Sequence, residues 1–544
     1  MLSSHPIDEL LDPSVLVQVA EHLAGAIASD AGGKTVDRLD LGRPFAQLVE
    51  ETRREIRAGS DPLGSAYCMV HSPAERRTRG QTFTPVGLIH GMFDWAARQS
   101  DNIARIVDPG AGSGRYALFA LRRFPRARAI AIEKDPALAL ILRANAAALG
   151  VSERLETIVA DYREISTPTI GGVTLFIGNP PYVRHHDIDP EWKHWYSEKL
   201  RELGHSCSQL AGLHLHFFLK TLELSKPGDL GCFVTAAEWL DVNYGQSLRD
   251  LMTNGLGGKA VFVVSAQVPV FDDAMVSAAV TCFAPHSDAS SIQFRGIQTE
   301  QELTVLDGGR PIPRAQARTE TKWSILVRGG RNERPAGHIE LGDIFKVHRG
   351  QVTGLNKVWV HGARSPNLPA RFLFPSITDA KDIIGAKSQA IDSTHGLRAV
   401  VDLPVSLDDL DPRERDQVDA FLDWARAQGA DKTYIAEHRA PWWRVRLRDP
   451  APIVVTYMGR RAPVFARNLV GARLINVAHG LYPREDHSID DEYFRDLVAW
   501  LNVNVKQESG RVYAGGLTKF EPSEVMRLYI PDQRTIAEFP HAAT

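Results

Sequence analysis

Short apolar segments alternate with longer amphipathic stretches from about residue 80 to residue 285. The apolar segments are rich in β-branched residues and read IARIVD, RAIAIE, LETIVA, VTLFIG, LGCFVT, AVFVVS and SAAVTCF. Strands that alternate with helices in this way predict a mostly parallel sheet covered by helices on both faces. The pattern therefore predicts an α/β domain, to which we assign residues 76–285.

The segments on either side of this domain have different patterns. Residues 1–75 carry apolar and charged positions at helical spacing, as in PFAQLVEETRREIRAG, and predict an N-terminal helical extension. Residues 286–337 are richer in Gly, Pro, Arg and polar side chains and predict a linker. Residues 338–544 have weaker periodicity and many aromatics, and predict a second, α+β domain.

Composition narrows the class of protein. The chain has 544 residues, 44% of them hydrophobic and 24% charged, which is typical of a soluble multidomain protein. No uncharged apolar run reaches the ~18–20 residues that span a bilayer, and the N-terminus lacks the features of a secretory signal. The four cysteines (Cys68, Cys207, Cys232 and Cys282) have no C-x-x-C spacing, which fits a reducing cytoplasm and predicts no thiolate metal site. The net charge of -3 does not decide the partner, because one face of an acidic molecule can be basic.

A glycine-rich turn follows the first strand of the α/β domain. The strand ends at Asp108, Gly110, Gly112 and Gly114 follow, and a helix begins near Tyr116. Glycines allow positive φ and a close approach of the backbone to a ligand, and the start of a helix offers free N–H groups to an anion. The turn is a candidate cofactor-binding loop, although glycines also serve strand-to-helix turns that bind nothing.

Acidic residues follow the next two strands. Glu133 lies at the end of RAIAIE, about 20 residues past the glycines, where a carboxylate can accept hydrogen bonds from ribose hydroxyls. The strand LETIVA leads to Asp161 and Tyr162, which could bind the amino group and the face of an adenine. Together with Asp108, these acids lie at the carboxyl edge of a parallel sheet, where such folds bind ligands. A nicotinamide-dependent dehydrogenase would fit equally well at this point.

The fourth strand, VTLFIG, ends in Asn179-Pro180-Pro181-Tyr182, which a dehydrogenase does not need but an amine methyltransferase does. The side-chain oxygen of Asn179 and the carbonyl of Pro180 can accept from the two N–H bonds of an exocyclic amine, which favours a pyramidal, nucleophilic nitrogen. The prolines stiffen the turn, and Tyr182 offers a ring on which a base can stack. This chemistry needs no metal and no nucleophilic cysteine. Methylation of cytosine C5 is excluded, because no cysteine follows a proline.

With these motifs and GQTFTPVGLIHGMFDWA at 80–96, the chain resembles the gamma-class N6-adenine DNA methyltransferases of bacterial restriction–modification systems, the TaqI-like group. The resemblance implies a Rossmann-like class I methyltransferase domain with a mixed sheet, followed by a DNA target-recognition domain. It also implies S-adenosylmethionine as the methyl donor. Within 268–283, VPVFDDAMVSAAVTCF resembles the motif whose aromatic packs on the flipped adenine, which assigns that role to Phe271.

The resemblance also assigns residues to the cofactor. Thr84 would open a helix beside the methionine end, Glu133 would bind the ribose, and Asp161 with Tyr162 would bind the adenine. The amino-acid part would contact the strand end and glycine turn, namely Asp108, Pro109, Gly110, Ala111 and Gly112. Asn179 is assigned to both the cofactor and the catalytic site.

The C-terminal region contains candidates for contacts with DNA. HIELGDIFKVHRGQVTGLNKVWV at 338–360 resembles the start of the target-recognition domain of the same family. Arginines interleaved with aromatics between residues 439 and 467 suit phosphate contacts and base-edge readout, although a solvated basic face would look similar. The candidate DNA-binding residues are Arg444, Arg446, Arg460, Arg461 and Lys519.

The resemblance implies a sequence-specific methyltransferase that modifies N6 of a flipped adenine in double-stranded DNA and protects it from a cognate restriction endonuclease. Alternatives are a cytosine-N4 methyltransferase and a catalytically silent DNA-binding module. A protein-glutamine methyltransferase would leave the last 200 or so residues without a role. The roughly 75 residues before the core are too few for a fused nuclease, so any endonuclease partner is expected to be separate. By the resemblance, we expect a cytoplasmic monomer.

Overall fold

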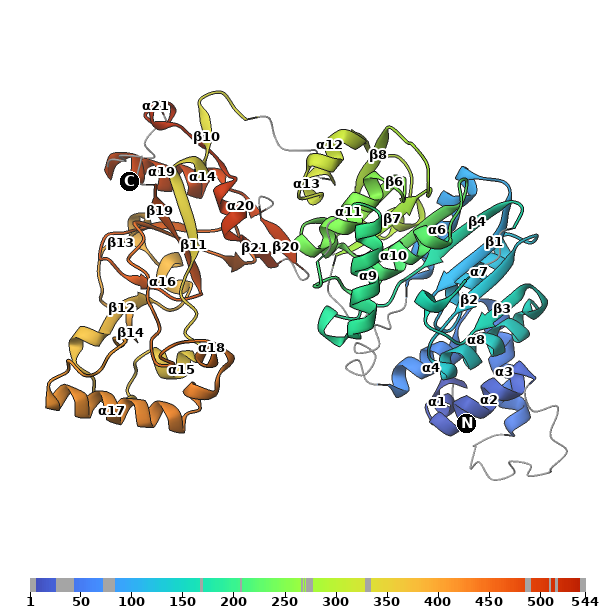
Figure 1. The fold of residues 1–544 in the computed structure, drawn as a ribbon, viewed down its shortest axis with the longest axis horizontal. Coiled ribbons are helices and arrows are strands. Elements are labelled where there is room, and N and C mark those ends of the chain that lie inside the picture. The colour runs from blue at the N-terminus through green and yellow to red at the C-terminus, as the bar shows by residue number, and fades with distance from the viewer. Residues whose placement is uncertain are drawn as a thin grey trace, which may run out of the picture. The chain divides into compact units, whose positions relative to one another are not determined.

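The structure is a computed structural model, and it describes most of the chain. The described residues are 6–25, 44–71, 84–166, 170–205, 208–265, 268, 270, 277–327, 334–484, 491–507, 510–513 and 517–538. The chain divides into two compact units, residues 1–331 and 332–544, and we describe each separately (Figure 1). None of the helices in the described ranges has the length and apolar character that a membrane span requires.

The first unit is built on a nine-stranded mixed sheet with strand order β3-β2-β1-β4-β5-β7-β6-β8-β9. The strands from β3 to β5 in this order run parallel, and β7 is antiparallel to both β5 and β6. The expected mixed α/β sheet is therefore confirmed. The strands are β1 (Ile103–Pro109), β2 (Arg128–Ile132), β3 (Leu155–Ile158), β4 (Val173–Gly178), β5 (Leu230–Ala236), β6 (Gly258–Val264), β7 (Ala278–Phe283), β8 (Ser291–Ile297) and β9 (Arg310–Pro313).

Helices cover both faces of this sheet, because side chains that alternate along each strand are apolar on both sides. In β4, Leu175 and Ile177 pack on one face with α6 (Val86–Gln99), α7 (Arg115–Arg123) and α8 (Pro136–Leu149). Phe176 points to the other face, which is covered by α9 (Pro190–Glu202), α10 (Leu213–Leu224) and α11 (Gln246–Thr253). The carboxyl ends of the parallel strands remain accessible between these two layers.

The N-terminal extension is helical, as expected, and it packs against α8 (Figure 1). Its helices are α1 (Pro6–Leu10), α2 (Pro13–Ala24), α3 (Phe45–Ala58) and α4 (Pro62–Val70). Residues Leu138, Ile141 and Ala144 of α8 are buried in the cluster that these helices form. Since α8 also carries Leu142 in the core beneath the sheet, it is apolar on two sides and joins the extension to the sheet.

The prediction of a linker at 286–337 is wrong over much of this segment. β8 and β9 are the last two strands of the large sheet, with β9 at its edge, and α12 (Arg314–Thr319) and α13 (Ser324–Val327) pack beside them. Ile292, Phe294 and Trp323 are buried in the same core as β4. A strand that buries only every second residue has polar or charged residues in between, so its composition resembles that of a loop.

The second unit is α+β, as expected, and its described residues form four small sheets. Their orders are β11-β19-β15-β17-β13, β14-β12-β18, β16-β21-β20 and β10-β22. The strands are β10 (His338–Glu340), β11 (Phe345–Arg349), β12 (Leu373–Ile377), β13 (Ala390–Ile391), β14 (Arg398–Val401), β15 (Ile453–Thr456), β16 (Met458–Gly459), β17 (Phe465–Asn468), β18 (Arg473–Leu474), β19 (Ala478–Pro483), β20 (Arg511–Tyr513), β21 (Leu517–Lys519) and β22 (Tyr529–Pro531).

Two of the larger apolar clusters of this unit each centre on one long helix. One cluster lies between the five-stranded sheet and α19 (Asp491–Asn504), with Phe345, Leu481 and Leu497 among its members. The other packs α17 (Pro412–Ala427) against Trp359. The shorter helices are α14 (Leu341–Ile344), α15 (Asn356–Trp359), α16 (Lys381–Ile384), α18 (Tyr434–Glu437), α20 (Pro522–Met526) and α21 (Gln533–Ile536).

Candidate active site

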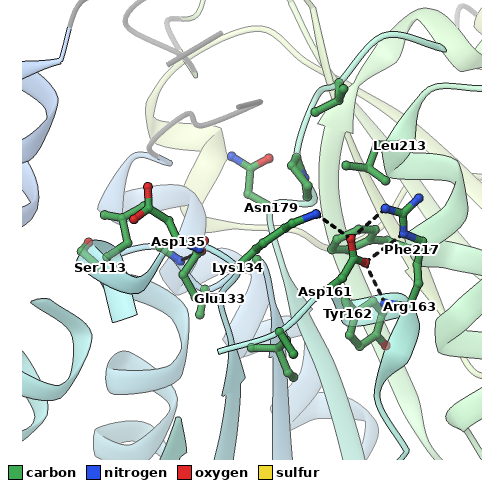
Figure 2. A pocket seen from close by; sticks show the side chains of 18 of the residues that line it. Ser113, Glu133, Lys134, Asp135, Asp161, Tyr162, Arg163, Asn179, Leu213 and Phe217 are labelled. Carbon is green, nitrogen blue, oxygen red and sulfur yellow. Dashed lines mark hydrogen bonds and ion pairs between the residues drawn. The ribbon is translucent and has the colours of Figure 1, made fainter. Parts of the chain in front are cut away.

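A cavity of about 690 Å³ lies at the carboxyl ends of β1 to β4 in the first unit (Figure 2). Its walls come from the segments that directly follow these strands, namely 110–113, 133–136, 160–163 and 179–183. Because the strands are parallel, all four segments meet at one edge of the sheet. The volume is in the range of about 300–1,000 Å³ that is common for small-molecule sites.

The cavity brings together most of the residues that the sequence predicts for a cofactor and catalytic site. Its lining includes Thr84, Gly110, Ala111, Gly112, Glu133, Asp161, Tyr162, Asn179 and Pro181. Asp108, Pro109, Pro180 and Tyr182 are adjacent in the chain but are not part of the lining. Phe271 lies outside the described residues.

The glycine turn has the geometry that requires glycine. Gly110, Gly112 and Gly114 have φ values of 72°, 57° and 94°, a region that other residues rarely adopt. The backbone N–H groups of Gly110 and Ala111 donate to the Ile132 carbonyl at 2.8 and 3.0 Å. The turn is therefore folded against the end of β2, and its backbone forms part of the cavity wall.

Asp108 lies beneath this turn and does not line the cavity, and its expected contact with the cofactor stays a prediction. It is fully buried, and its Oδ2 accepts a hydrogen bond from the Ala117 N–H at 2.9 Å. Burial raises the pKa of Asp108 to about 8, although the Ala117 N–H opposes the shift. Its Oδ1 has no hydrogen-bond partner among the described residues. Asp108 thus supports the first turn of α7.

Glu133 connects two loops of the cavity. Its Oε2 accepts from the Gly112 N–H at 2.8 Å, and its Oε1 accepts from the Asp135 N–H at 2.8 Å. Burial raises the pKa of Glu133, and these N–H groups partly oppose the shift. Each carboxylate oxygen has two acceptor sites, so Glu133 can also accept from hydroxyl groups of a ligand.

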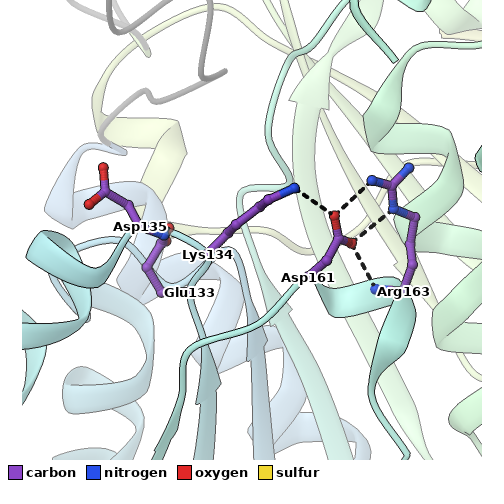
Figure 3. A network of polar contacts seen from close by, with 5 residues as sticks. All are labelled: Glu133, Lys134, Asp135, Asp161 and Arg163. Carbon is purple, nitrogen blue, oxygen red and sulfur yellow. Dashed lines mark hydrogen bonds and ion pairs between the residues drawn. The ribbon is translucent and has the colours of Figure 1, made fainter. Parts of the chain in front are cut away.

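Asp161 is the centre of a charged network (Figure 3). The Arg163 guanidinium binds it in two places, Nε to Oδ1 at 2.9 Å and Nη2 to Oδ2 at 2.7 Å, and Lys134 Nζ lies 3.4 Å from Oδ2. Burial opposes ionisation of Asp161, but the hydrogen bonds and charge of Arg163 outweigh it and lower the pKa to about 2. The Arg163 guanidinium also lies 4.2 Å from the centre of the Trp192 ring.

Asp161 was predicted from the sequence as a site residue, whereas Arg163 and Trp192 were not. Arg163 follows Asp161 by two residues in a short 3-10 turn that Asp161 caps, so this partner is local and could have been anticipated. Trp192 belongs to α9, and its role depends on how α9 packs. Both residues line the cavity.

An aromatic wall closes the side of the cavity next to α10. Tyr162 is buried, and its ring centre lies 5.0 Å from that of Phe217. The Tyr162 hydroxyl forms a hydrogen bond of 3.0 Å with Thr221 Oγ1. Leu213 and Phe217 complete this side, as Figure 2 shows. Such a wall suits the flat face of a heterocycle.

Asn179 is held by residues from two other elements. Its Nδ2 donates to Thr84 Oγ1 at 3.2 Å, and Thr84 Oγ1 also accepts from the Tyr116 hydroxyl at 3.0 Å. Thr84 and Tyr116 are both buried. The half-buried Tyr182 ring is fixed at its end by a hydrogen bond of 3.3 Å from its hydroxyl to the Val234 carbonyl. The sequence identified Tyr116 only as the start of a helix, so its contact with Thr84 was missed.

The candidate DNA-binding residues of the second unit lie in different segments of the chain. Arg460 and Arg461 are exposed in the connection between β16 and β17, and Lys519 pairs with Met458 of β16 in the adjacent strand. Lys519 Nζ is 2.6 Å from Glu521 Oε1, so an acid within the unit offsets its charge.

The other two candidates lie in the segment before β15. Arg444 is half-buried, and Arg446 is exposed with a φ of 62°. The Arg446 backbone N–H donates to Asp402 Oδ1 at 2.9 Å, and its Nη2 donates to the Ala440 carbonyl at 3.0 Å. The contacts of Arg446 thus hold this segment in place.

The mixed sheet and the cavity at its carboxyl edge fit a class I methyltransferase, and the similarities to known proteins show that this protein uses S-adenosylmethionine. Residues 155–266 match the family described as Eco57I restriction-modification methylase, and residues 333–543 match Type II methyltransferase M.Eco57I, C-terminal domain. Over 484 residues the chain is 48% identical to the Type II methyltransferase M.XamI of Xanthomonas campestris pv. amaranthicola, covering 89% of this chain and 90% of that protein.

Two more distant similarities are also found. The chain is 22% identical to the Type II methyltransferase M.AccI of Acinetobacter calcoaceticus, covering 84% of this chain and 86% of that protein. The type IIG restriction endonuclease BpuSI is similar with a TM-score of 0.49 and 15% identity, over 98% of this chain and 69% of that one. The identity to M.XamI shows that this protein belongs to the gamma-class methyltransferases of type II restriction–modification systems.

Proposed function

We propose that this protein transfers a methyl group from S-adenosylmethionine to N6 of an adenine that is flipped out of double-stranded DNA at a short specific sequence. The observation that carries this proposal is the position of Asn179. It follows β4 directly, lines the cavity, and begins the Asn179-Pro180-Pro181-Tyr182 turn. An acceptor at this place can bind an amine beside a cofactor in the same cavity.

The cavity fits S-adenosylmethionine in shape and in chemistry. A Cβ added to Gly110 would lie 3.3 Å from Pro181 Cδ, so the glycine turn and the catalytic turn are close neighbours. Glu133 would accept from the ribose hydroxyls, and Asp161 from the adenine amino group. Tyr162 and Phe217 would border the adenine, and Thr84 would lie near the methionine end. When bound, the cofactor supplies an electrophilic methyl group on a sulfonium.

The residues around Asn179 would orient and activate the amine. Because Asn179 Nδ2 is bound to Thr84, the amide oxygen faces the opposite direction, where it can accept one N–H of the amine. The Pro180 carbonyl would accept the other. The two acceptors localise the nitrogen lone pair, which would form the N–C bond while the bond between the methyl group and sulfur breaks and S-adenosylhomocysteine leaves. The proton lost by the amine would pass to solvent. The Tyr182 ring would stack on the flipped base.

The second unit would bind and read the DNA. Arg460 and Arg461 are exposed neighbours and would contact phosphates, whereas Arg444, Arg446 and Lys519 are weaker candidates because they are partly buried or engaged within the unit. The modified sequence would be protected from a separate cognate endonuclease. We propose that the protein acts as a monomer in the cytoplasm.

The same acceptor geometry would serve methylation of cytosine N4, which is the second candidate. Asn179, where a Ser would favour cytosine, supports adenine through the resemblance to the gamma class. A catalytically silent module is disfavoured, because the hydrogen bonds of Asn179 and the cavity are both present.

The test is to express the protein in cells whose DNA is otherwise unmethylated, and to analyse that DNA by single-molecule sequencing and nucleoside mass spectrometry. The control is Asn179→Ala, with its binding of S-adenosylhomocysteine measured in parallel. N6-methyladenine at one short sequence, absent in the control, supports the proposal. N4-methylcytosine would refute the assignment of the base. Unmodified DNA with normal S-adenosylhomocysteine binding would indicate the silent module.

A further inference from the structure

Helix α4 of the N-terminal extension contacts both loops at the edge of the cavity. Asp61 caps its N-terminus, and Tyr67 lies in its second turn. Tyr67 is 3% exposed, and it is part of the cavity lining although it precedes the catalytic core in the chain. No motif in the sequence assigns a role in the cofactor site to either residue.

Asp61 binds the end of the glycine turn. Its Oδ2 accepts from Ser113 Oγ at 2.6 Å and from Arg115 Nε at 3.1 Å. Its Oδ1 accepts from the Gly64 N–H at 3.0 Å and from Asn145 Nδ2 at 3.1 Å. Asn145 Nδ2 also donates to the Ser113 carbonyl at 3.0 Å, so the last part of the turn is held from two sides.

Tyr67 binds the loop after β2. Its hydroxyl donates to Asp135 Oδ2 at 2.7 Å, while Asp135 Oδ1 accepts from the Ala137 N–H at 2.9 Å and so caps α8. The Asp135 N–H in turn donates to Glu133, which accepts from Gly112. One hydrogen-bonded path therefore runs from α4 through the proposed ribose-binding acid to the glycine turn.

These contacts go beyond what docking of the extension requires. The helices of the extension already pack on α8 through apolar residues such as Leu63 and Ala66. Buried polar groups stabilise a fold only when they are fully hydrogen-bonded, so apolar contacts alone would hold α4 more simply. The approach is also close, because a Cβ on Gly64 would lie 2.7 Å from Ser113 Oγ.

We propose that α4 is a part of the cofactor site. Asp61 is a positioning residue for the glycine turn, and Tyr67 positions Asp135 and Glu133 while forming a wall of the cavity. Affinity for the cofactor then depends on the extension, and by linkage the bound cofactor stabilises α4. This inference rests on the cofactor site proposed above and does not depend on which base is methylated.

The test measures S-adenosylhomocysteine affinity of the full chain by isothermal titration calorimetry. Tyr67→Phe removes one hydroxyl, and Asp61→Asn keeps a good N-cap residue while losing the charge and half of the acceptor capacity. The matched control is Arg57→Gln, because Arg57 Nε donates to the Ala148 carbonyl at the far end of α8, at 2.9 Å. Arg57→Gln breaks a contact between the extension and α8 that does not involve the cavity loops.

We expect Tyr67→Phe to weaken affinity about fivefold and Asp61→Asn about tenfold or more, with Arg57→Gln within about twofold of the wild type. Equal affinities for all four proteins would overturn the proposal, as would an equal loss in the control, which would indicate general destabilisation. A wild-type chain that fails to bind would instead refute the cofactor site itself.

A second measurement uses the unaltered protein. Hydrogen exchange of residues 62–70 should slow when S-adenosylhomocysteine is added, together with that of residues 110–117. Slower exchange in the glycine turn without any change in α4 would show that the two are not coupled, and would overturn the inference even if a variant failed to fold.

Discussion

Replacing Arg163 by Met tests how the cavity keeps Asp161 ionised. The substitution removes two charged hydrogen bonds to Asp161 and the stacking on Trp192, and it leaves the contact of Lys134 at 3.4 Å. Met has a similar apolar stem, so the loss is mainly that of the guanidinium. We expect the catalytic unit to be destabilised and its affinity for the cofactor to fall.

The magnitude follows from the pKa of Asp161, which is about 2 in place of the model-peptide value of 3.8. At about 1.36 kcal/mol per pKa unit, this shift corresponds to ~2.4 kcal/mol, which solvent screening at the rim of the cavity reduces to about 1–2 kcal/mol. Loss of the contact with Trp192 adds about 0.5–2 kcal/mol. We therefore expect the free energy of unfolding of this unit to fall by about 1.5–4 kcal/mol, which at its upper end approaches the cost of breaking a buried ion pair.

The contribution of Asp161 to stability depends on pH with the opposite sign in Arg163→Met. In the wild type, the lowered pKa of Asp161 contributes stability that is present above about pH 4 and is lost as the pH falls toward 2. Without Arg163, burial dominates and raises the pKa of Asp161, so the variant loses stability as the pH rises through that higher value. The difference in stability between the wild type and the variant should therefore be larger at pH 7.5 than at pH 5.

The assay is thermal unfolding of the full chain at several pH values, combined with calorimetric titration of S-adenosylhomocysteine. The matched control is Arg123→Met, because Arg123 also contacts a carboxylate, Asp94 at 3.4 Å, and an aromatic ring, Phe124 at 5.5 Å. That pair is about half exposed and should contribute less than about 1 kcal/mol. Equal losses of stability from the two substitutions would contradict this prediction. So would a stability difference between the wild type and Arg163→Met that does not vary with pH.

Three further predictions concern other parts of the molecule. The pKa of Asp108 is raised to about 8, so ionisation of this buried carboxyl should lower the stability of the protein progressively as the pH rises from about 4 to about 8. Asp108→Asn should therefore reduce the fall of the melting temperature between pH 6 and pH 8. Tyr116→Phe removes the donor to Thr84 and should lower kcat about tenfold with little change in S-adenosylhomocysteine affinity, so an unchanged kcat in steady-state assays would contradict it. Changing Arg460 and Arg461 to Gln should reduce the slope of log affinity for DNA against log salt by about two, and identical slopes would exclude both as phosphate contacts.

Features within one segment of the chain could be read directly from the sequence. The seven apolar segments became strands because strand formation follows local alternation and β-branched content. The glycine turn was predicted because positive φ requires glycine, and Glu133 and Asp161 were predicted to meet because parallel strands end at one edge of a sheet. The strands at 291–297 and 310–313 were missed, since a half-buried strand with polar and charged residues has the composition of a loop.

Local propensity and chain order are enough to predict the fold class, the order of the motifs and the residue types at the cavity. The packing of separate elements decides which groups touch. Tyr67 and Asp135 lie 68 positions apart, and Thr84 and Asn179 lie 95 apart, yet each pair is hydrogen-bonded. The same packing places Asp108 beneath the turn. Helical periodicity can predict helices such as α4, α6 and α9, but it does not indicate the neighbours against which they pack.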